Sequence, residues 1–493
     1  MAGRVILRGV AKIHRVGSVL LAATAVASAV LALVTIVARA ALPYQLDYEE
    51  GNILNAAVRI THGLTPYPDP HAWPNVLNPY GPVMYYVVAS LVKVFGVTFW
   101  PGRLVVIAAG MAVAVCIALL LKRESGSAVI GVGFGALFLC SSMVQFWWPL
   151  MRVDIVGLAL SLAGMVVFRW NNPTVNDPTQ AKGSLEWGTN RLSILLMAVL
   201  FVAAIFTKHT LVAAPAACAA WALVNRQKRT AVQLLAACAA LGLGCLAVGE
   251  IATRGVLGFA LLGMHPDPFR WSAYTDALRG IAEMYPLLAM LAVVLAIGDV
   301  REKKISLPLL YLLFAVATML TIGKVGSNSN HMLEVIAALC LATGAGWSYL
   351  AQLRGVWVLV PVTIAGIMAF QLVDGSRELA FEPRNSACEQ VIAIIRQQPG
   401  AEILSENTGA VVQAGKVPLI SNTFVYTQLV KYGGWSDADL VKKLNAREVP
   451  MVVMDAARRQ MWSRDMLQAL RANYEPSEKC DCRYAGLMFL PKR

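Results

Sequence analysis

Three carboxylates stand within four residues in the stretch LDYEEGNI (46–53), directly after the first long apolar run of the chain. They belong to Asp47, Glu49 and Glu50. A carboxylate can act as a general base that takes the proton of an attacking hydroxyl group. If the leaving group is anionic, lysine or arginine side chains must also be close by to neutralise it. The stretch therefore indicates a reaction centre only if the fold brings cations to it.

Four other polar clusters interrupt the apolar runs, namely WWPLMRVD (147–154), TKHT (207–210), GMHPDPFRW (263–271) and GKVGSNSNHMLE (323–334). Ionisable residues near membrane depth are costly and by default indicate a functional site. The polar candidates in these clusters are Arg152, Asp154, Lys208, His209, His265, Arg270, Lys324, Asn330, His331 and Glu334.

The elements that must position these residues are membrane-spanning helices. The chain of 493 residues is 57% hydrophobic and 14% charged, with a mean hydropathy of +0.60, whereas soluble domains carry about 25% charged residues. Apolar runs near residues 17–42, 101–121, 127–146, 154–168, 192–207, 210–224, 231–250, 281–298, 306–322, 331–350 and 355–373 predict a mainly α, polytopic bundle of about eleven spans. A further run, 80–96, is short and carries Lys93, so we expect it to lie at the membrane interface.

The basic residues orient this bundle. The net charge of +13 is spread over short clusters between apolar runs, which favours the positive-inside rule over nucleic-acid binding. With eleven spans, the loops on the N-terminal side are about three times denser in lysine and arginine than the opposite loops. The N-terminus is then cytoplasmic, and all five polar clusters face outside. A signal peptide ending near Ala38 is the competing interpretation of residues 18–42, but the run is longer than the apolar part of such a peptide.

The composition changes after residue 373, so residues 1–373 are predicted as the membrane domain and 374–493 as a small outer α/β domain. Segments 401–406, 417–421, 450–455 and 483–491 read as short buried strands, and 386–398 and 458–474 have helical spacing. Cys388, Cys480 and Cys482 lie in this part. In an oxidising compartment Cys388 would pair with Cys480 or Cys482, and three free thiols is the alternative.

Each cluster also has a plainer interpretation. Glu49 and Glu50 can cap the helix that follows, Arg152 and Asp154 can form a surface ion pair, and Lys208 can extend its amine to the interface. His265 and Arg270 flank a turn and either bind an anion or order the loop. His331 and Glu334 share a helix face, as a metal pair or through hydrogen bonds at a helix start.

Group transfer from a lipid phosphate is a reaction that uses a carboxylate, cations and an apolar groove at a membrane surface together. The groove between helices would hold the lipid tail. The outer loops contain no Walker A or GxGxxG sequence, so no nucleotide is expected.

The chain resembles the GT-C polytopic glycosyltransferases, in the bacterial branch of protein O-mannosyltransferases, aminoarabinose transferases and lipopolysaccharide galacturonosyltransferases. DYEEG resembles the D-x-(G/E)-E-G signature of the family's first outer loop. In order along the chain, further matches are RITHGLTPYPDP with NPYGPVMYYVVASLVKVFG, WPLMRVDIVGLALSLAGM, FTKHTLVAAPAA, GSNSNHMLE and ILSENTGAVVQAGKVPLI. The sequence departs from the family in having Tyr80-Gly81-Pro82 for Tyr-Pro-Pro and His209 where Gln is common.

The resemblance implies an inverting transferase that uses a polyprenyl-phosphate sugar, with Asp47 as the base. Asp154 or Glu49 would orient the acceptor or a divalent ion, and the implied phosphate ligands are Lys208, Lys324 and Arg270, with Arg152 behind them. Glu50, Tyr80, His209, His265, Asn330, His331 and Glu334 complete the expected substrate site. A divalent metal (Mg, Mn or Zn) stays open, with Asp47, Asp154, His331 and Glu334 as candidate ligands.

The predicted function is sugar transfer to a lipid-, glycan- or protein-linked acceptor on the outer face of a bacterial inner membrane. A lipid or oligosaccharide flippase is a rival, but it needs polar residues at mid-membrane and paired broken helices. A ligase or polymerase that uses diphosphate-linked oligosaccharides and a non-catalytic assembly subunit are the other rivals. No nucleic-acid partner is expected.

Overall fold

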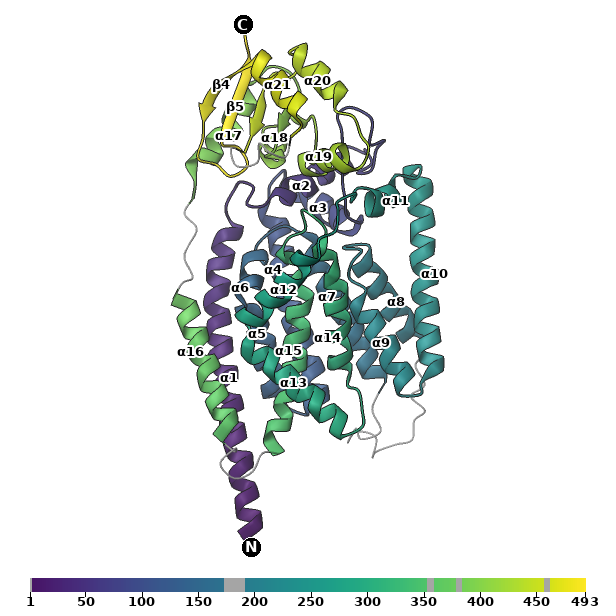
Figure 1. Cartoon of the computed structure of the whole chain (residues 1–493), viewed down its shortest axis with the longest axis vertical. Coiled ribbons are helices and arrows are strands. Elements are labelled where there is room, and N and C mark those ends of the chain that lie inside the picture. Colours follow the sequence, from purple (N-terminus) through teal and green to yellow (C-terminus); the bar gives the residue numbers. More distant parts are fainter. Residues whose placement is uncertain (1, 173–190, 353–358, 378–383, 456–461) are drawn as a thin grey trace.

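The structure is a computed structural model that describes residues 2–172, 191–352, 359–377, 384–455 and 462–493 (Figure 1). It has a long helical bundle and, at one end of it, an α/β unit that carries the C-terminus. The N-terminus lies at the opposite end.

Each predicted apolar run contains all or part of at least one helix. The bundle helices are α1 (Ala2–Ala40), α4 (Trp100–Ser125), α5 (Ala128–Cys140), α6 (Ser142–Trp147), α7 (Val153–Asn171), α8 (Arg191–Ile205), α9 (Ala213–Val224), α10 (Lys228–Thr253), α11 (Val256–Gly258), α12 (Trp271–Met284), α13 (Pro286–Arg301), α14 (Leu307–Thr318), α15 (Leu333–Trp347) and α16 (Val360–Arg377), with short 3-10 or π segments η2 (Phe259–Gly263), η3 (Met319–Gly323), η4 (Ser329–Met332) and η5 (Ser348–Gln352). Within the described residues, five helices are long and apolar enough to cross a membrane, or six if α12 and α13 are taken as one bent span. Residues 355–358 of the last predicted run lie outside the described residues.

Two predicted runs are not single helices. Run 127–146 breaks at Ser141, whose backbone is extended, between α5 and α6. Run 281–298 begins inside α12, and α12 and α13 meet at an angle of 96°. Pro286 starts α13, and Tyr285 before it leaves the helical region because a proline disfavours the α conformation of its predecessor.

Helix α15 forms the centre of the bundle, and every residue from Leu333 to Trp347 is buried. Its many small residues let neighbouring helices approach closely, as is common in membrane bundles. A Cβ atom on Gly346 would lie 2.5 Å from the carbonyl oxygen of Leu291 on α13. Helix α1 lies at the side of the bundle beside α16 and packs one face against it, with Leu21, Ala25 and Ile36 buried (Figure 1).

Helices α2 (Tyr48–Thr61) and α3 (Val83–Phe95) pack together between the bundle and the α/β unit (Figure 1). Above them, β1 (Glu402–Ser405), β2 (Val417–Pro418), β3 (Val452–Met454), β4 (Tyr474–Lys479) and β5 (Leu487–Pro491) form one sheet of order β2-β1-β3-β5-β4. The β2-β1-β3 part is parallel, and β5 pairs antiparallel with β3 and β4. The helices of the α/β unit are α17 (Ser386–Gln397), α18 (Thr408–Gln413), α19 (Thr423–Tyr432), α20 (Ala438–Asn445) and α21 (Arg464–Asn473).

The α/β unit is richer in elements than the sequence indicated. Strands β1, β2, β3 and β5 fall within predicted strand segments, but β4 and helices α18 to α20 were not predicted. Strand β4 is an edge strand that contains Pro476, a residue tolerated only at such edges. The predicted helix 458–474 corresponds to α21, and residues 458–461 lie outside the described part. Of the two cysteine pairings left open, the structure has Cys388–Cys482, and Cys480 is not part of this disulfide.

Candidate active site

A cavity of about 760 Å³ lies where the bundle meets the α/β unit. All five polar clusters contribute to its wall, as expected if they share one end of the bundle. Its lining includes Asp47, Glu49, Tyr80, Arg152, Lys208, His209, His265, Asp267, Lys324, Asn330 and His331, with Tyr48, Phe424 and Tyr484.

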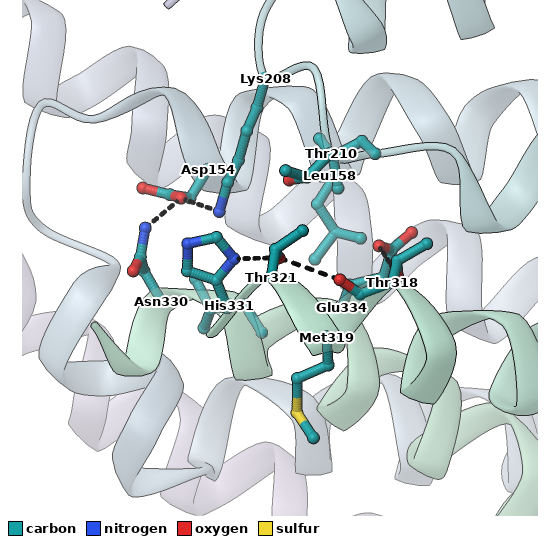
Figure 2. A pocket seen from close by; sticks show the side chains of 12 residues that line it. Asp154, Leu158, Lys208, Thr210, Thr318, Met319, Thr321, Asn330, His331 and Glu334 are labelled. Carbon is teal, nitrogen blue, oxygen red and sulfur yellow. Dashed lines mark hydrogen bonds and ion pairs between the residues drawn. The ribbon is translucent and has the colours of Figure 1, made fainter. Parts of the chain in front are cut away.

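A chain of alternating charges lies beside this cavity: Asp47, Arg152 and Lys208 line it, and Asp154, which links Arg152 to Lys208, lines a smaller cavity next to it. Arg152, the residue before α7, forms ion pairs with Asp47 and with Asp154, the latter with 3.1 Å between Nε and Oδ2. Lys208 lies 2.6 Å from the other oxygen of Asp154, and the Asn330 amide donates to that same oxygen at 2.7 Å (Figure 2). Because Asp154 is only 3% exposed, the interpretation of Arg152 and Asp154 as a surface pair is wrong.

Asp47 is placed by the start of α2. It is the N-cap residue, and its Oδ1 accepts the backbone N–H of Glu49 at 3.1 Å. The guanidinium of Arg152 packs over the Trp147 ring, 4.9 Å from its centre, which limits where the cation can move. Asp47 thus faces the cavity from a rigid helix end with a cation beside it.

Glu49 and Tyr80 lie next to this pair. The two carboxylate oxygens of Glu49 accept from the amides of Asn52, at 3.1 Å, and Asn422, at 3.3 Å. Burial raises the pKa of Glu49 above its ordinary value, and Arg152 opposes part of that rise. The Tyr80 hydroxyl accepts from Arg152 at 3.4 Å, and burial raises the pKa of Tyr80.

Glu50 does not line the cavity, although it was expected in the substrate site. Its side chain is fully buried against Arg103 of α4, and its Oε1 also accepts the backbone N–H of Met151 at 2.8 Å. Its Oε2 accepts backbone N–H groups of Leu46 and Asp47, which completes a capping box on α2. Burial raises the pKa of Glu50, but Arg103 and the backbone N–H groups of Met151 and Leu46 together outweigh burial, so the pKa is lowered overall. Of the two interpretations, helix capping is the one that the geometry supports.

Lys324, His209 and His265 form a second group on the cavity wall. The Lys324 amine donates to the His265 carbonyl oxygen at 3.0 Å and forms no ion pair with any carboxylate of the described residues. The His209 and His265 rings lie 5.5 Å apart, and each has one buried ring nitrogen without a hydrogen-bond partner among the described residues. Burial lowers the pKa of both, that of His209 to about 4. These two rings are therefore neutral near pH 7.

Arg270, which was expected to bind the phosphate, does not line the cavity. Its neighbour Phe269 forms a β-bridge with Lys324, and the Arg270 N–H donates to the Gly323 carbonyl oxygen at 2.7 Å. Side chains of extended residues alternate in direction. The Phe269 ring packs on Gly323, and the Arg270 side chain is exposed.

Glu334 lines a much smaller cavity of about 20 Å³ beside the large one (Figure 2). It accepts from the hydroxyls of Tyr311 and Thr318, both at 3.4 Å. His331 borders both cavities, and its Nδ1 lies 2.8 Å from the Thr321 hydroxyl. The His331–Glu334 pair is thus held by hydrogen bonds to hydroxyl groups.

The donor set does not fit a divalent metal ion. No three His, Cys, Asp or Glu side chains of the described residues gather in a way that could hold one. Of the candidate ligands, Asp47 is paired with Arg152, and Asp154 is already neutralised by two cations. A metal ion at Asp154 would have to displace these cations.

Several residues at the site were not predicted from the sequence. Asn422, Phe424 and Tyr484 belong to the α/β unit, and Tyr48 lies inside the DYEEG stretch itself. Arg103 carried a visible signal, since it is a charge within the first turn of an apolar run. Asn422 and Tyr484 had no such signal in the sequence, because nothing near them in the chain links them to α2.

No protein-family model matches the chain, and no curated protein matches it by sequence. Among solved structures it is similar to ArnT from Cupriavidus metallidurans bound to undecaprenyl phosphate (TM-score 0.61, 13% identity, 94% of this chain and 97% of that one). It is also similar to the apo state of that ArnT (TM-score 0.62, 13% identity, with the same coverage). The Archaeoglobus fulgidus oligosaccharyltransferase complex with Zn and sulfate matches at a TM-score of 0.50, with 13% identity over 90% of this chain and 69% of that one. The chain therefore shares the polytopic helical membrane fold of these solved structures.

Proposed function

We propose that the protein is an integral-membrane inverting glycosyltransferase. It moves a sugar from a polyprenyl-phosphate donor to a lipid-, glycan- or protein-linked acceptor. The observation that carries the proposal is the single cavity in which the carboxylates Asp47 and Glu49 face the cations Arg152, Lys208 and Lys324.

Asp47 is the proposed general base. The acceptor oxygen forms a bond to the anomeric carbon of the sugar while the bond from that carbon to the phosphate oxygen breaks. The electron pair leaves with the polyprenyl phosphate, and the hydroxyl proton passes to the Asp47 carboxylate. Attack opposite to the leaving group inverts the anomeric centre.

The cations serve the leaving phosphate. Lys324 has no carboxylate partner among the described residues, so its charge is available to an anion. Lys208 and Arg152 are held in place by Asp154 and add fixed positive charge, which is most effective where water is excluded. The neutral rings of His209 and His265 add hydrogen-bonding nitrogens on the same wall.

The apolar part of the wall suits a prenyl chain. Val212, Leu261, Leu262, Met264 and Ala317 line the cavity. Val212 and Leu262 are also 41% and 75% exposed on the outside of the bundle, where lipid chains would lie. The undecaprenyl phosphate bound to ArnT supports a donor lipid of this class.

The proposed location is a bacterial inner membrane, with the N-terminus in the cytoplasm and the α/β unit outside. The basic clusters at 122–123, 226–229 and 301–304 support this orientation. A disulfide in the α/β unit fits an oxidising compartment.

The test is sugar transfer by the purified protein in lipid nanodiscs. Radiolabelled polyprenyl-phosphate sugars are the donors, and glycolipids or peptides are the acceptors. We expect transfer by the wild type and a loss of about 100-fold or more in Asp47→Asn, because general-base catalysis contributes that much. Asparagine caps helices as well as aspartate does, so α2 is retained. Asp69→Asn, an exposed residue of the loop after α2, is the matched control.

Other results would point to the rivals. Transfer only from diphosphate-linked oligosaccharides would indicate a ligase or polymerase. Movement of the intact donor across liposomes without transfer would indicate a flippase. Full activity of Asp47→Asn would remove the catalytic assignment, and an unchanged rate with a chelator would agree with a site that holds no metal.

A further inference from the structure

The α/β unit reaches into the active-site cavity. Phe424 and Val425, at the start of α19, line the cavity together with Tyr484. Tyr484 has a φ of 64°, which is uncommon for a bulky residue. The loop that carries it is tied to the α1–α2 connection, since Arg483 donates to the Leu46 carbonyl oxygen at 3.1 Å.

Tyr48 docks α2 onto the first turn of α19. Its buried hydroxyl donates to Asn422 Oδ1 at 2.9 Å, accepts the backbone N–H of Phe424 at 2.7 Å, and lies 3.0 Å from the Thr423 hydroxyl. Because Tyr48 adjoins both Asp47 and Glu49, this contact joins the α/β unit directly to the catalytic carboxylates.

The orientation of the Asn422 amide follows from its partners. Its Oδ1 caps α19 by accepting the backbone N–H of Val425 at 3.0 Å, and it also accepts from Tyr48. The backbone N–H of Val425 can only donate, so the oxygen must lie there and the NH₂ group must lie on the other side. That NH₂ group donates to Glu49 Oε1 at 3.3 Å.

Glu49 is consequently held between two amides, Asn52 from its own helix and Asn422 from the α/β unit. Both amides donate, and a donor stabilises the ionised form of a buried carboxyl group. Burial acts in the opposite direction on the pKa of Glu49. Arg152 is the strongest of the groups that favour the ionised form of Glu49, and Asp47 opposes it. The Asn422 amide, 373 positions further along the chain, adds a smaller contribution in favour of the ionised form.

We propose that Asn422 is a positioning residue that directs Glu49 at the acceptor and favours its ionised form, so that the α/β unit completes the active site. This inference rests on the proposed glycosyl transfer. In this role, Glu49 accepts a hydrogen bond from a neighbouring O–H or N–H group of the acceptor and so orients the attacking oxygen, while Asp47 takes the proton of the attacking hydroxyl.

The test is Asn422→Asp, which keeps an oxygen for the α19 cap and replaces the donor to Glu49 by a second acceptor. We expect kcat to fall by about 10- to 100-fold, since a hydrogen bond to a charged group is lost, with KM for the donor unchanged. The pKa of Glu49 rises without its donor, so the acidic limb of the pH profile of kcat moves to higher pH. Asn422→Ser also lacks the amide but adds no charge, and should show a smaller shift in the same direction.

Asn385→Asp is the matched control. Asn385 caps α17 in the same unit and donates to the Asp481 carbonyl oxygen, and it does not line the active-site cavity. We expect it to behave as the wild type. A fall in kcat with an unmoved acidic limb in both Asn422 variants would show a merely structural role and overturn the proposal.

Infrared spectroscopy can follow the titration of Glu49 without any transferase activity. The Glu49 carboxyl band is identified by its loss in Glu49→Gln. The midpoint should lie at higher pH in Asn422→Asp than in wild type, and equal midpoints would overturn the inference. If the wild type transfers no sugar from any donor, the proposed function fails and the role of Asn422 in transfer fails with it. If the wild type transfers sugar and Asn422→Asp matches it in kcat and pH profile, only the inference fails.

Discussion

Glu50 and Arg103 form a two-point ion pair in which neither side chain is exposed. The distances are 2.8 Å from Nε to Oε1 and 2.8 Å from Nη2 to Oε2. Arg103 also donates to the carbonyl oxygens of Leu42 and Tyr44. The pair therefore fixes the connection between α1 and α2 to the first turn of α4, and with it the start of α2 where Asp47 stands.

Breaking this pair should unfold the active-site end of the bundle. Removal of one partner from a buried ion pair costs about 3–5 kcal/mol, because the other charge stays buried and uncompensated. We expect Glu50→Gln to lower the thermal midpoint strongly, as followed by size-exclusion chromatography after heating. Glu302→Gln, in an exposed pair with Lys304, should melt like the wild type. A Glu50→Gln protein with a normal midpoint and no transfer would instead place Glu50 in the chemistry.

Lys324 should contribute to donor binding more than to folding. It is exposed, lines the cavity, and forms no carboxylate pair in the described part of the chain. Lys324→Gln should raise KM for the polyprenyl-phosphate sugar about 10-fold, the value of one charged hydrogen bond, and leave the thermal midpoint unchanged. Lys303→Gln, exposed at the opposite end of the bundle, is the control. A normal KM in Lys324→Gln would assign the phosphate to other cations.

His209 should make the protein less stable in acid. Burial, with His265 and Lys208, lowers the pKa of His209 from 6.5 to about 4. Below pH 6.5 His209 is protonated in the unfolded chain but stays neutral in the folded protein. Stability is therefore lost as the pH falls from 6.5 to about 4. We expect His209→Gln to reduce this loss in thermal unfolding measured across that range. His62→Gln, at an exposed position, should retain the full loss, and equal curves for the two variants would contradict the assignment.

The disulfide should protect two of the three cysteines of the α/β unit from thiol reagents. In unfolded but unreduced protein, maleimide should label Cys480 and leave Cys388 and Cys482 unlabelled, as read by peptide mass spectrometry. The bridge closes a loop of 94 residues, and its removal in a Cys388→Ser/Cys482→Ser protein should cost about 2–4 kcal/mol. Cys480→Ser should have no such effect. Labelled Cys482 with protected Cys480 would show the other pairing.

Much of the architecture could be read from the sequence because a membrane restricts the possibilities. Buried backbone groups in lipid must be satisfied within each segment, so a long apolar run becomes a helix. Successive runs then force the loops to alternate between two ends. This alternation is why Asp47, Arg152, Lys208, His265 and Lys324 could be expected on one cavity wall. The helix breaks at Ser141 and Tyr285 were harder to predict from the sequence, since each depends on a single residue within an apolar run.

The role of each charged residue was decided only by tertiary contacts. Glu49 and Glu50 are neighbours in sequence, but successive side chains on a helix point about 100° apart. Glu49 faces the cavity, and Glu50 faces Arg103. Arg270 looked equivalent to Lys324 as a phosphate ligand, but its place in an extended segment leaves it outside the cavity. Asn422 meets Glu49 only because the α/β unit packs on α2. Local sequence thus determined that carboxylates and cations would gather at one end of the bundle, while long-range packing determined which carboxylates face the cavity and which only hold the helix in place.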